Sequence, residues 1–141
     1  MIVTFCGHRE VQEAEKVRKW LCETVEGLIQ EGADCFYLGG YGQFDSMAAD
    51  VVWETKQKYP HIRSVLVLPY LDREYDMSGY DESIYPPLEK IPRRYAISKR
   101  NEYMVDRADL VVAYVIYCFG GANKTFQYAY RKRKRIVRYT Q

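Results

Sequence analysis

The residues best suited to chemistry lie in a glycine-rich turn, residues 38–45, with the sequence LGGYGQFD. Three glycines within four residues cost backbone entropy, so the turn must need their freedom or their lack of a side chain. The turn follows an apolar run and precedes a helix-like segment that begins at Ser46. Backbone N–H groups at such a strand end and helix start can bind a phosphate. The alternative is a tight turn that packs helix on strand, which needs one or two glycines.

Two other turns also follow apolar runs: Gly7-His8-Arg9, and residues 120–125 with the sequence GGANKT. In an open parallel sheet, ligands bind beyond the carboxyl ends of the strands. We therefore expect the three turns to converge on one crevice, where backbone N–H groups hold phosphate, Arg9 supplies charge and Thr125 a hydroxyl. Neither GxGxxG nor GxxxxGK[ST] is present, so the dinucleotide and P-loop fingerprints do not match.

The charged residues of these turns also have ordinary structural roles open to them. His8 can bind phosphate or act as a general acid, or it can cap a helix or satisfy backbone groups. Arg9 can contact a phosphate or pair with Glu10 or Glu13 on the surface. Asp45 can bind a ribose hydroxyl, and it is equally suited to cap the next helix.

Hydrophobic periodicity predicts the elements that position these turns. Short apolar runs rich in β-branched residues indicate strands, and apolar residues at helical spacing indicate amphipathic helices. The predicted strands cover residues 2–6, 34–38, 62–69, 109–118 and 135–139, and the predicted helices cover about 20 residues before Gly32, then 46–58, 96–107 and 125–132. This alternation predicts one α/β, Rossmann-like domain over residues 1–141, with a mainly parallel sheet of about five strands and helices on both faces.

Residues 71–97 interrupt the alternation with prolines, scattered acids and tyrosines. We interpret this long segment as a lid or a partner surface, because long irregular segments in compact domains are usually functional. The alternative, a disordered excursion, fits poorly with its tyrosines. Arg100, in the next predicted helix, can pair with the acids of this segment or face the crevice, and we favour the crevice. His61 lies at the opposite edge of the sheet and is interpreted as structural.

Composition narrows the class of protein. With 48% hydrophobic and 28% charged residues over 141 positions, the chain is expected to form a soluble domain with a sizeable core. Neither a signal-peptide pattern nor a run of about 20 apolar residues is present, so we expect a cytoplasmic protein with no membrane contact. The net charge is only +2. The basic run 131–135 with Arg138 can hold nucleic-acid phosphates, but such runs at helix ends are usually solvated. Nucleic-acid binding is therefore kept as an alternative that we do not favour.

The four cysteines are widely spaced and include no CxxC pair. Cys6, Cys35 and Cys118 lie in apolar, strand-like runs, which favours reduced core thiols over disulfides or zinc ligands. Activation of Cys6 as a nucleophile would need a histidine–carboxylate pair, and none is visible. We predict neither a metal nor a cofactor.

A family resemblance covers nearly the whole chain in the right order. It is carried by residues 4–9, 39–45, 67–70, 95–97, 100–105, 108–109 and 120–122 with Thr125. The chain resembles the YpsA-like branch (DUF1273) of the SLOG superfamily, a Rossmann-like group that also contains the LOG cytokinin-activating enzymes and DprA. The resemblance implies a nucleotide-related ligand in the crevice and a homodimer.

The resemblance to LOG-type phosphoribohydrolases is only partial. Their Arg-Lys-x-x-Met helix is matched here at Arg100 and Met104, but their Pro-Gly-Gly-x-Gly-Thr-x-x-Glu turn is not matched. The expected glutamate position holds Gln127 or Tyr128. Splitting an N-glycosidic bond usually needs a carboxyl group as acid or base, so binding is favoured over hydrolysis.

The sequence therefore predicts a protein that binds or senses a nucleotide or a nucleotide-sugar such as ADP-ribose, in a regulatory role. The alternatives are an N-glycosidic hydrolase of nucleotide-type substrates and, with less support, a DprA-like module that binds single-stranded nucleic acid. The candidates for catalysis are Arg100 and Asp45. The predicted ligand-binding residues are Gly7, His8, Arg9, Gly39, Gly40, Gly42, Asp45, Arg100, Asn101, Gly120, Gly121 and Thr125.

Overall fold

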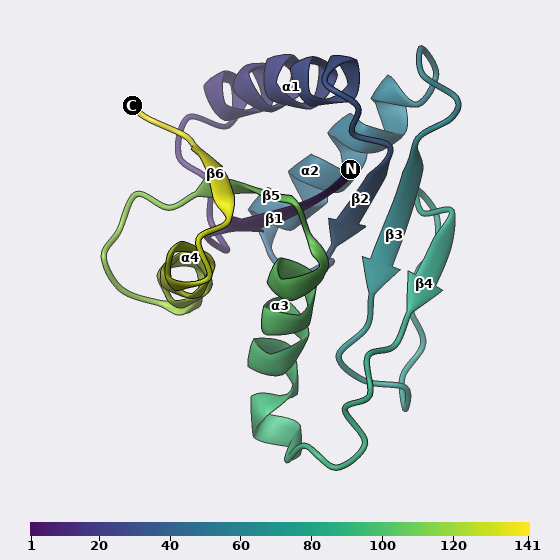
Figure 1. The fold of residues 1–141 in the computed structure, drawn as a ribbon, viewed down its shortest axis with the longest axis vertical. Coiled ribbons are helices and arrows are strands. Elements are labelled where there is room, and N and C mark those ends of the chain that lie inside the picture. The colour runs from purple at the N-terminus through teal and green to yellow at the C-terminus, as the bar shows by residue number, and fades with distance from the viewer.

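Six strands pair side by side in the order β4-β3-β2-β1-β5-β6, and every pairing is parallel. Figure 1 shows this sheet in the computed structural model, which describes residues 1–141. The elements are β1 (Ile2–Gly7), α1 (Ala14–Gln30), β2 (Cys35–Leu38), α2 (Gln43–Thr55), β3 (Arg63–Val67), β4 (Glu82–Ile84), the 3-10 turn η1 (Arg93–Tyr95), α3 (Ala96–Arg107), β5 (Leu110–Tyr114), α4 (Gly121–Arg131) and β6 (Arg135–Arg138). The predicted Rossmann-like α/β architecture is confirmed. None of the helices combines the length and the apolar character that a membrane span requires.

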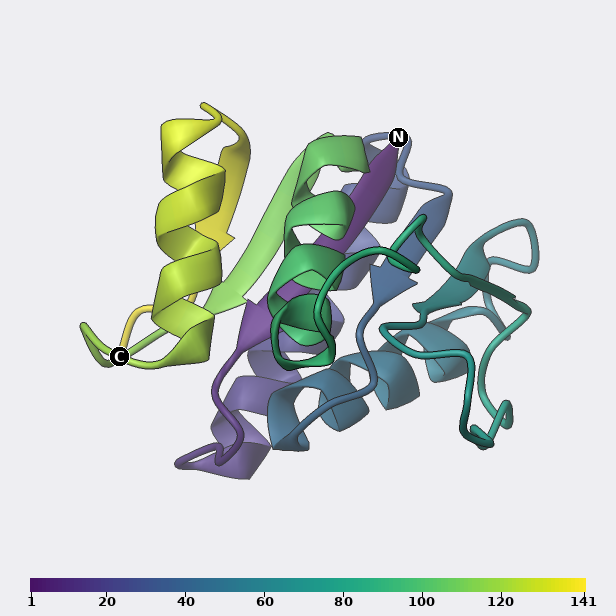
Figure 2. The ribbon, with the colours of Figure 1, turned by 90° about the horizontal axis from the view of Figure 1, so that it is seen from below.

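Helices cover both faces of the sheet. In Figure 2, α3 and α4 lie on one side of the strands, and α1 and α2 lie on the other. The largest apolar cluster, of 21 buried residues, includes the inward stripe of α1: Val17, Leu21 and Val25 are fully buried there. Their helical spacing is the pattern that predicted this helix. Burial of each such side chain contributes roughly 1.5–3 kcal/mol, so this face anchors α1 on the sheet.

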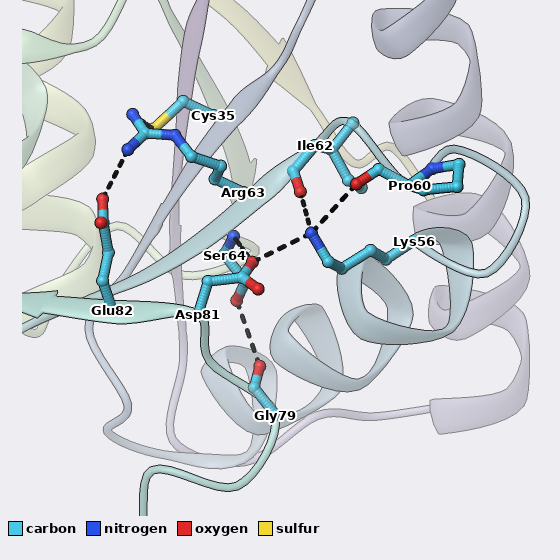
Figure 3. Close-up of polar contacts among 9 residues, drawn as sticks. All are labelled: Cys35, Lys56, Pro60, Ile62, Arg63, Ser64, Gly79, Asp81 and Glu82. Carbon is cyan, nitrogen blue, oxygen red and sulfur yellow. Dashed lines mark hydrogen bonds and ion pairs between the residues drawn. The ribbon is translucent and has the colours of Figure 1, made fainter.

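The sixth strand, β4, lies within the segment that interrupts the sequence alternation. It has only three residues and no apolar run, so periodicity did not reveal it. Polar contacts attach this edge strand to its neighbours (Figure 3). The Asp81 carboxylate accepts a hydrogen bond from the Ser64 N–H (2.8 Å) and pairs with the Lys56 ammonium (3.3 Å). Arg63 and Glu82 form a second, exposed ion pair at 2.7 Å. Part of the predicted lid therefore extends the sheet.

The chain leaves the sheet earlier after β5 than the sequence indicated. The strand ends at Tyr114, and Cys118 is exposed rather than part of the core. α4 then begins at Gly121, because the preceding residue, Gly120, reverses the chain with φ 91°. Of the five residues between the strand and Gly120, Val115 stays buried in the core, whereas Tyr117, Cys118 and Phe119 are exposed at the surface.

Candidate functional site

A cavity of about 620 Å³ opens at the carboxyl ends of β1 and β5, with residues from β1, α2, α3 and α4 and their preceding turns in its wall. Strand order reverses at this point, because β2, β3 and β4 lie on one side of β1 and β5 and β6 lie on the other. The volume lies within the range of roughly 300–1,000 Å³ that is typical of small-molecule sites. Most of the predicted ligand-binding residues line it: Gly7, His8, Arg9, Asp45, Arg100, Asn101, Gly120, Gly121 and Thr125.

The three glycines of the turn at residues 38–45, called the opening turn below, do not line the cavity. Contacts within the protein and backbone conformation account for glycine at these positions. A Cβ atom on Gly39 would lie 3.0 Å from the Asp45 carboxylate and 3.2 Å from the Arg100 guanidinium. Gly40 and Gly42 have φ of 67° and 94°, which side chains rarely adopt. This turn therefore makes room for two buried charged groups, and packing and backbone conformation account for its glycines.

The glycines before and at the start of α4 are different. A Cβ atom on Gly120 or Gly121 would meet nothing within 4 Å. Gly120 is needed for its positive φ, but neither packing nor a positive φ demands glycine at Gly121. The first N–H groups of a helix have no intrahelical acceptor and carry partial positive charge. The α4 N-terminus thus presents uncovered donors at the cavity wall, whereas the Gln43 N–H of α2 already donates to Arg9 O (2.8 Å).

Arg100 is the largest fully buried side chain, with only 1% of its surface exposed. Its Nη1 donates to the carbonyl oxygens of Gly39 and Val67, both at 2.8 Å, and its Nε donates to Asn101 Oδ1 at 2.9 Å. Burial lowers the pKa of the guanidinium, and nearby Asp45 opposes that shift. Nη2 makes no hydrogen bond to the protein and is the donor that remains for a ligand. Arg100 lines the cavity, as favoured from the sequence, and pairs with none of the acids of the segment 71–97. Ile97 is the one residue of that segment in the cavity wall.

Asp45 is 91% buried beside Arg100. Its Oδ2 accepts a hydrogen bond from the Tyr41 N–H (3.1 Å), which leaves Oδ1 without a protein partner. Burial raises the pKa of the carboxyl to about 6, although Arg100 and the Tyr41 N–H both act in the opposite direction. Asp45 does not occupy the predicted N-cap position, because α2 begins at Gln43 and Gly42 precedes it. It lies in the first turn and binds a backbone N–H outside the helix.

His8 satisfies backbone groups rather than caps a helix. Its Nε2 accepts hydrogen bonds from the N–H groups of Ile116 (2.9 Å) and Tyr117 (3.3 Å), so the neutral ring carries its proton on Nδ1. Burial lowers the pKa of His8, which keeps Nε2 available as an acceptor. In this arrangement the imidazole attaches the end of β1 to the turn after β5.

We expect NMR of the imidazole nitrogens to show His8 as the Nδ1–H tautomer, with a titration midpoint below the ordinary value near 6.5. Protonation puts a hydrogen on Nε2 and removes the acceptor of Ile116 and Tyr117, so folding opposes it. His61 makes no such bond and serves as the internal reference for the tautomer. An Nε2–H tautomer at neutral pH would contradict the assignment.

Arg9 is bound to an aromatic ring of the same cavity. Its guanidinium donates to the Tyr41 hydroxyl and lies 4.9 Å from the centre of the Tyr41 ring, and it does not pair with Glu10 or Glu13. Sequence reasoning missed Tyr41 and two further aromatic residues of the wall, Tyr117 and Phe119. Their positions in the sequence could have indicated this role, since each of the three lies within or shortly before a glycine-rich turn.

Two other features considered from the sequence are Cys6, which lines the cavity, and the basic run 131–135. Burial raises the pKa of Cys6 to about 12, and Asp45 adds to the shift, so the thiol is held protonated and is a poor nucleophile. The basic run lines a separate groove through Arg131, Arg133 and Lys134, with Tyr130. Part of its charge is already used, because Arg135 pairs with Glu31 at 2.8 Å.

The fold and the cavity together place the chain in the class of Rossmann-like α/β domains with a ligand-sized crevice at the point where strand order reverses. No protein-family model matches it. The chain is similar to a UPF0398 protein of Halalkalibacterium halodurans, with 30% identity over 111 residues, which is 70% of this chain and 59% of that protein. It is also similar to a UPF0398 protein of Lysinibacillus sphaericus, with 29% identity over 58 residues, which is 41% of this chain and 32% of that protein.

Among solved structures, the chain resembles DNA processing protein A of Helicobacter pylori, which was solved in a study of its single-stranded DNA binding mode. The TM-score is 0.69 and the match covers 100% of this chain and 66% of that one, but the sequence identity is 16%. A likeness at this identity concerns the fold. The chain spans 59% or less of the length of the two UPF0398 relatives. Together with them, the likeness supports the resemblance to the YpsA-like branch of the SLOG superfamily that the sequence indicated.

Proposed function

We propose that the protein binds a nucleotide or a nucleotide-sugar such as ADP-ribose in this cavity and acts as a sensor or regulator. The observation that carries the proposal is the buried pair Arg100 and Asp45, which lines the same cavity as the N-terminus of α4. Each of the two side chains keeps one polar atom without a protein partner, Nη2 of Arg100 and Oδ1 of Asp45. Neither atom is fully enclosed by the protein, so each can form a hydrogen bond with a polar ligand in the cavity.

The chemistry of these groups matches the two polar parts of a nucleotide. A guanidinium nitrogen and the N–H groups of a helix N-terminus bind phosphate oxygens. A carboxylate oxygen accepts hydrogen bonds from ribose hydroxyls. Thr125 adds a hydroxyl oxygen to the wall, although its hydrogen is donated to Gly121 O at 3.1 Å.

The proposal predicts that AMP or ADP-ribose raises the melting temperature of the protein and binds it in calorimetry. Gly121→Val should weaken that binding at least 10-fold, because the new side chain stands where a phosphate must approach the α4 N–H groups. Gly27→Val is the matched control, since a Cβ there also meets nothing within 4 Å but lies in α1, outside the cavity. The proposal is wrong if no nucleotide stabilises the protein, or if Gly121→Val binds as tightly as the unaltered chain.

A hydrolase that splits an N-glycosidic bond is the second candidate, and one observation favours it. Asp45 offers a carboxyl whose pKa, about 6, suits a general acid or base near neutral pH. Asp45, in α2, thus supplies the carboxyl group that the sequence lacks at Gln127 and Tyr128 in α4. This candidate predicts release of free base from AMP, seen by chromatography, and its loss in Asp45→Asn. Binding of AMP without base release would leave the sensor as the better description.

Binding of single-stranded nucleic acid has less support, because the likeness to DNA processing protein A concerns the fold and the basic run is partly paired. It would show as binding that weakens steeply with salt and is lost when residues 131–135 are neutralised. The homodimer and the cytoplasmic location stay predictions.

A further inference from the structure

Three aromatic rings form a row that ends at the mouth of the cavity. The His8 and Tyr117 rings are 4.9 Å apart, and the Tyr117 and Phe119 rings stack at 5.3 Å with an angle of 22° between their planes. All three residues line the cavity. Tyr117 is further held by a hydrogen bond that its hydroxyl accepts from the Gln12 amide. The row is therefore fixed at its inner end, while Phe119, its outer ring, is 69% exposed.

An exposed phenylalanine on a fixed aromatic row has a face free for another flat ring. Aromatic rings associate by offset stacking, and a base on an aromatic side chain is worth roughly 1–3 kcal/mol. Phe119 also lies two residues before Gly121, so the two backbone positions are at most about 7 Å apart. One ligand whose flat ring and phosphate are joined by a single sugar can therefore reach both.

We propose that Phe119, supported by Tyr117, is a base-stacking platform that makes the cavity selective for nucleotides over sugar phosphates without a base. The inference rests on the proposed function, and names the part of the ligand that the aromatic wall recognises. The phosphate is assigned to the α4 N-terminus and Arg100, and the base to Phe119. Tyr41, on the other side of β1, keeps its ring against Arg9 and is not part of the platform.

The test compares Phe119→Leu with the unaltered protein, using AMP and ribose 5-phosphate as the two probes in calorimetry. The variant keeps an apolar side chain but loses the flat face, so AMP should bind about 5-fold to 150-fold more weakly, the range that corresponds to stacking of one base. Ribose 5-phosphate should bind the unaltered protein more weakly than AMP does, and its affinity should not change in the variant. Tyr130→Leu is the matched control, because Tyr130 is also 69% exposed and lies outside this cavity.

The two hypotheses fail in different ways. If AMP binds and Phe119→Leu leaves its affinity unchanged, the platform is wrong and the nucleotide site stands. If ribose 5-phosphate binds the unaltered protein as tightly as AMP, the base makes no contribution and the platform is again wrong. If neither AMP nor ADP-ribose binds at millimolar concentration, the proposed function is wrong and the platform falls with it.

Discussion

Arg100→Met is expected to lower the free energy of unfolding by about 3–5 kcal/mol, because each buried acceptor that loses its donor costs roughly 1–3 kcal/mol and Arg100 serves two of them. Methionine fills a similar apolar volume but donates no hydrogen bond. The Gly39 and Val67 carbonyl oxygens would each lose the bond they receive from Nη1, and Asp45 would lose the cation beside it. Since small domains are stable by roughly 5–15 kcal/mol, this loss is a large fraction of the total.

Urea denaturation followed by circular dichroism measures this effect. Lys99→Met is the matched control, because Lys99 is the neighbouring residue on α3 and forms only an exposed pair with Glu102 at 3.4 Å. Such surface pairs contribute about 0–1 kcal/mol, so the control should unfold close to the unaltered protein. Equal midpoints for the two variants would mean that Arg100 is held in place by packing alone and does not organise the cavity wall.

The fold was predictable because the four central strands, β3, β2, β1 and β5, are largely buried. Runs such as Val65 to Leu68 and the inward stripe of α1 leave little choice about which segments are strands and which are helices. β4 was not predicted, because an edge strand with the residues ESI has no apolar run. Contacts such as the ion pair of Asp81 with Lys56 hold it in place. Those contacts join positions far apart in the sequence, and periodicity does not report them.

The sequence predicted most of the residues that line the cavity, but not which of them contact a ligand and which serve packing. The three turns do converge, because parallel strands bring their carboxyl ends to one edge. The turn at residues 38–45 looked like a phosphate loop, but Gly39 makes room for Arg100, which lies 61 residues beyond it, and Gly40 and Gly42 have a positive φ. The glycines that line the cavity at a helix start are those of α4 instead. Partners this distant decide which glycines serve packing, so only the structure separates the two turns.

The contribution of Asp45 to the stability of the protein is expected to fall as pH rises through the range of about 4 to 6. Its pKa is raised from 3.8 to about 6 in the folded state, chiefly by burial. Between these values the folded state binds more protons than the unfolded state, so the free energy of unfolding decreases with pH. The separation of about two pH units corresponds to about 3 kcal/mol. This stabilisation is fully present below about pH 4 and is lost above about pH 6.

Asp45→Asn isolates this contribution. Asparagine keeps an oxygen for the Tyr41 N–H and carries no charge, so relative to the unaltered protein it should gain about 3 kcal/mol between pH 4 and pH 7. Taking the difference removes every other titrating group, including His8, whose lowered pKa acts in the opposite direction. Asp50→Asn, at an exposed position of the same helix, is the control and should change little with pH. A difference that stays flat for Asp45→Asn would mean that Arg100 fully compensates the burial of the carboxylate. The carboxyl would then be ionised throughout, which would remove the one observation that favours acid–base chemistry at this site.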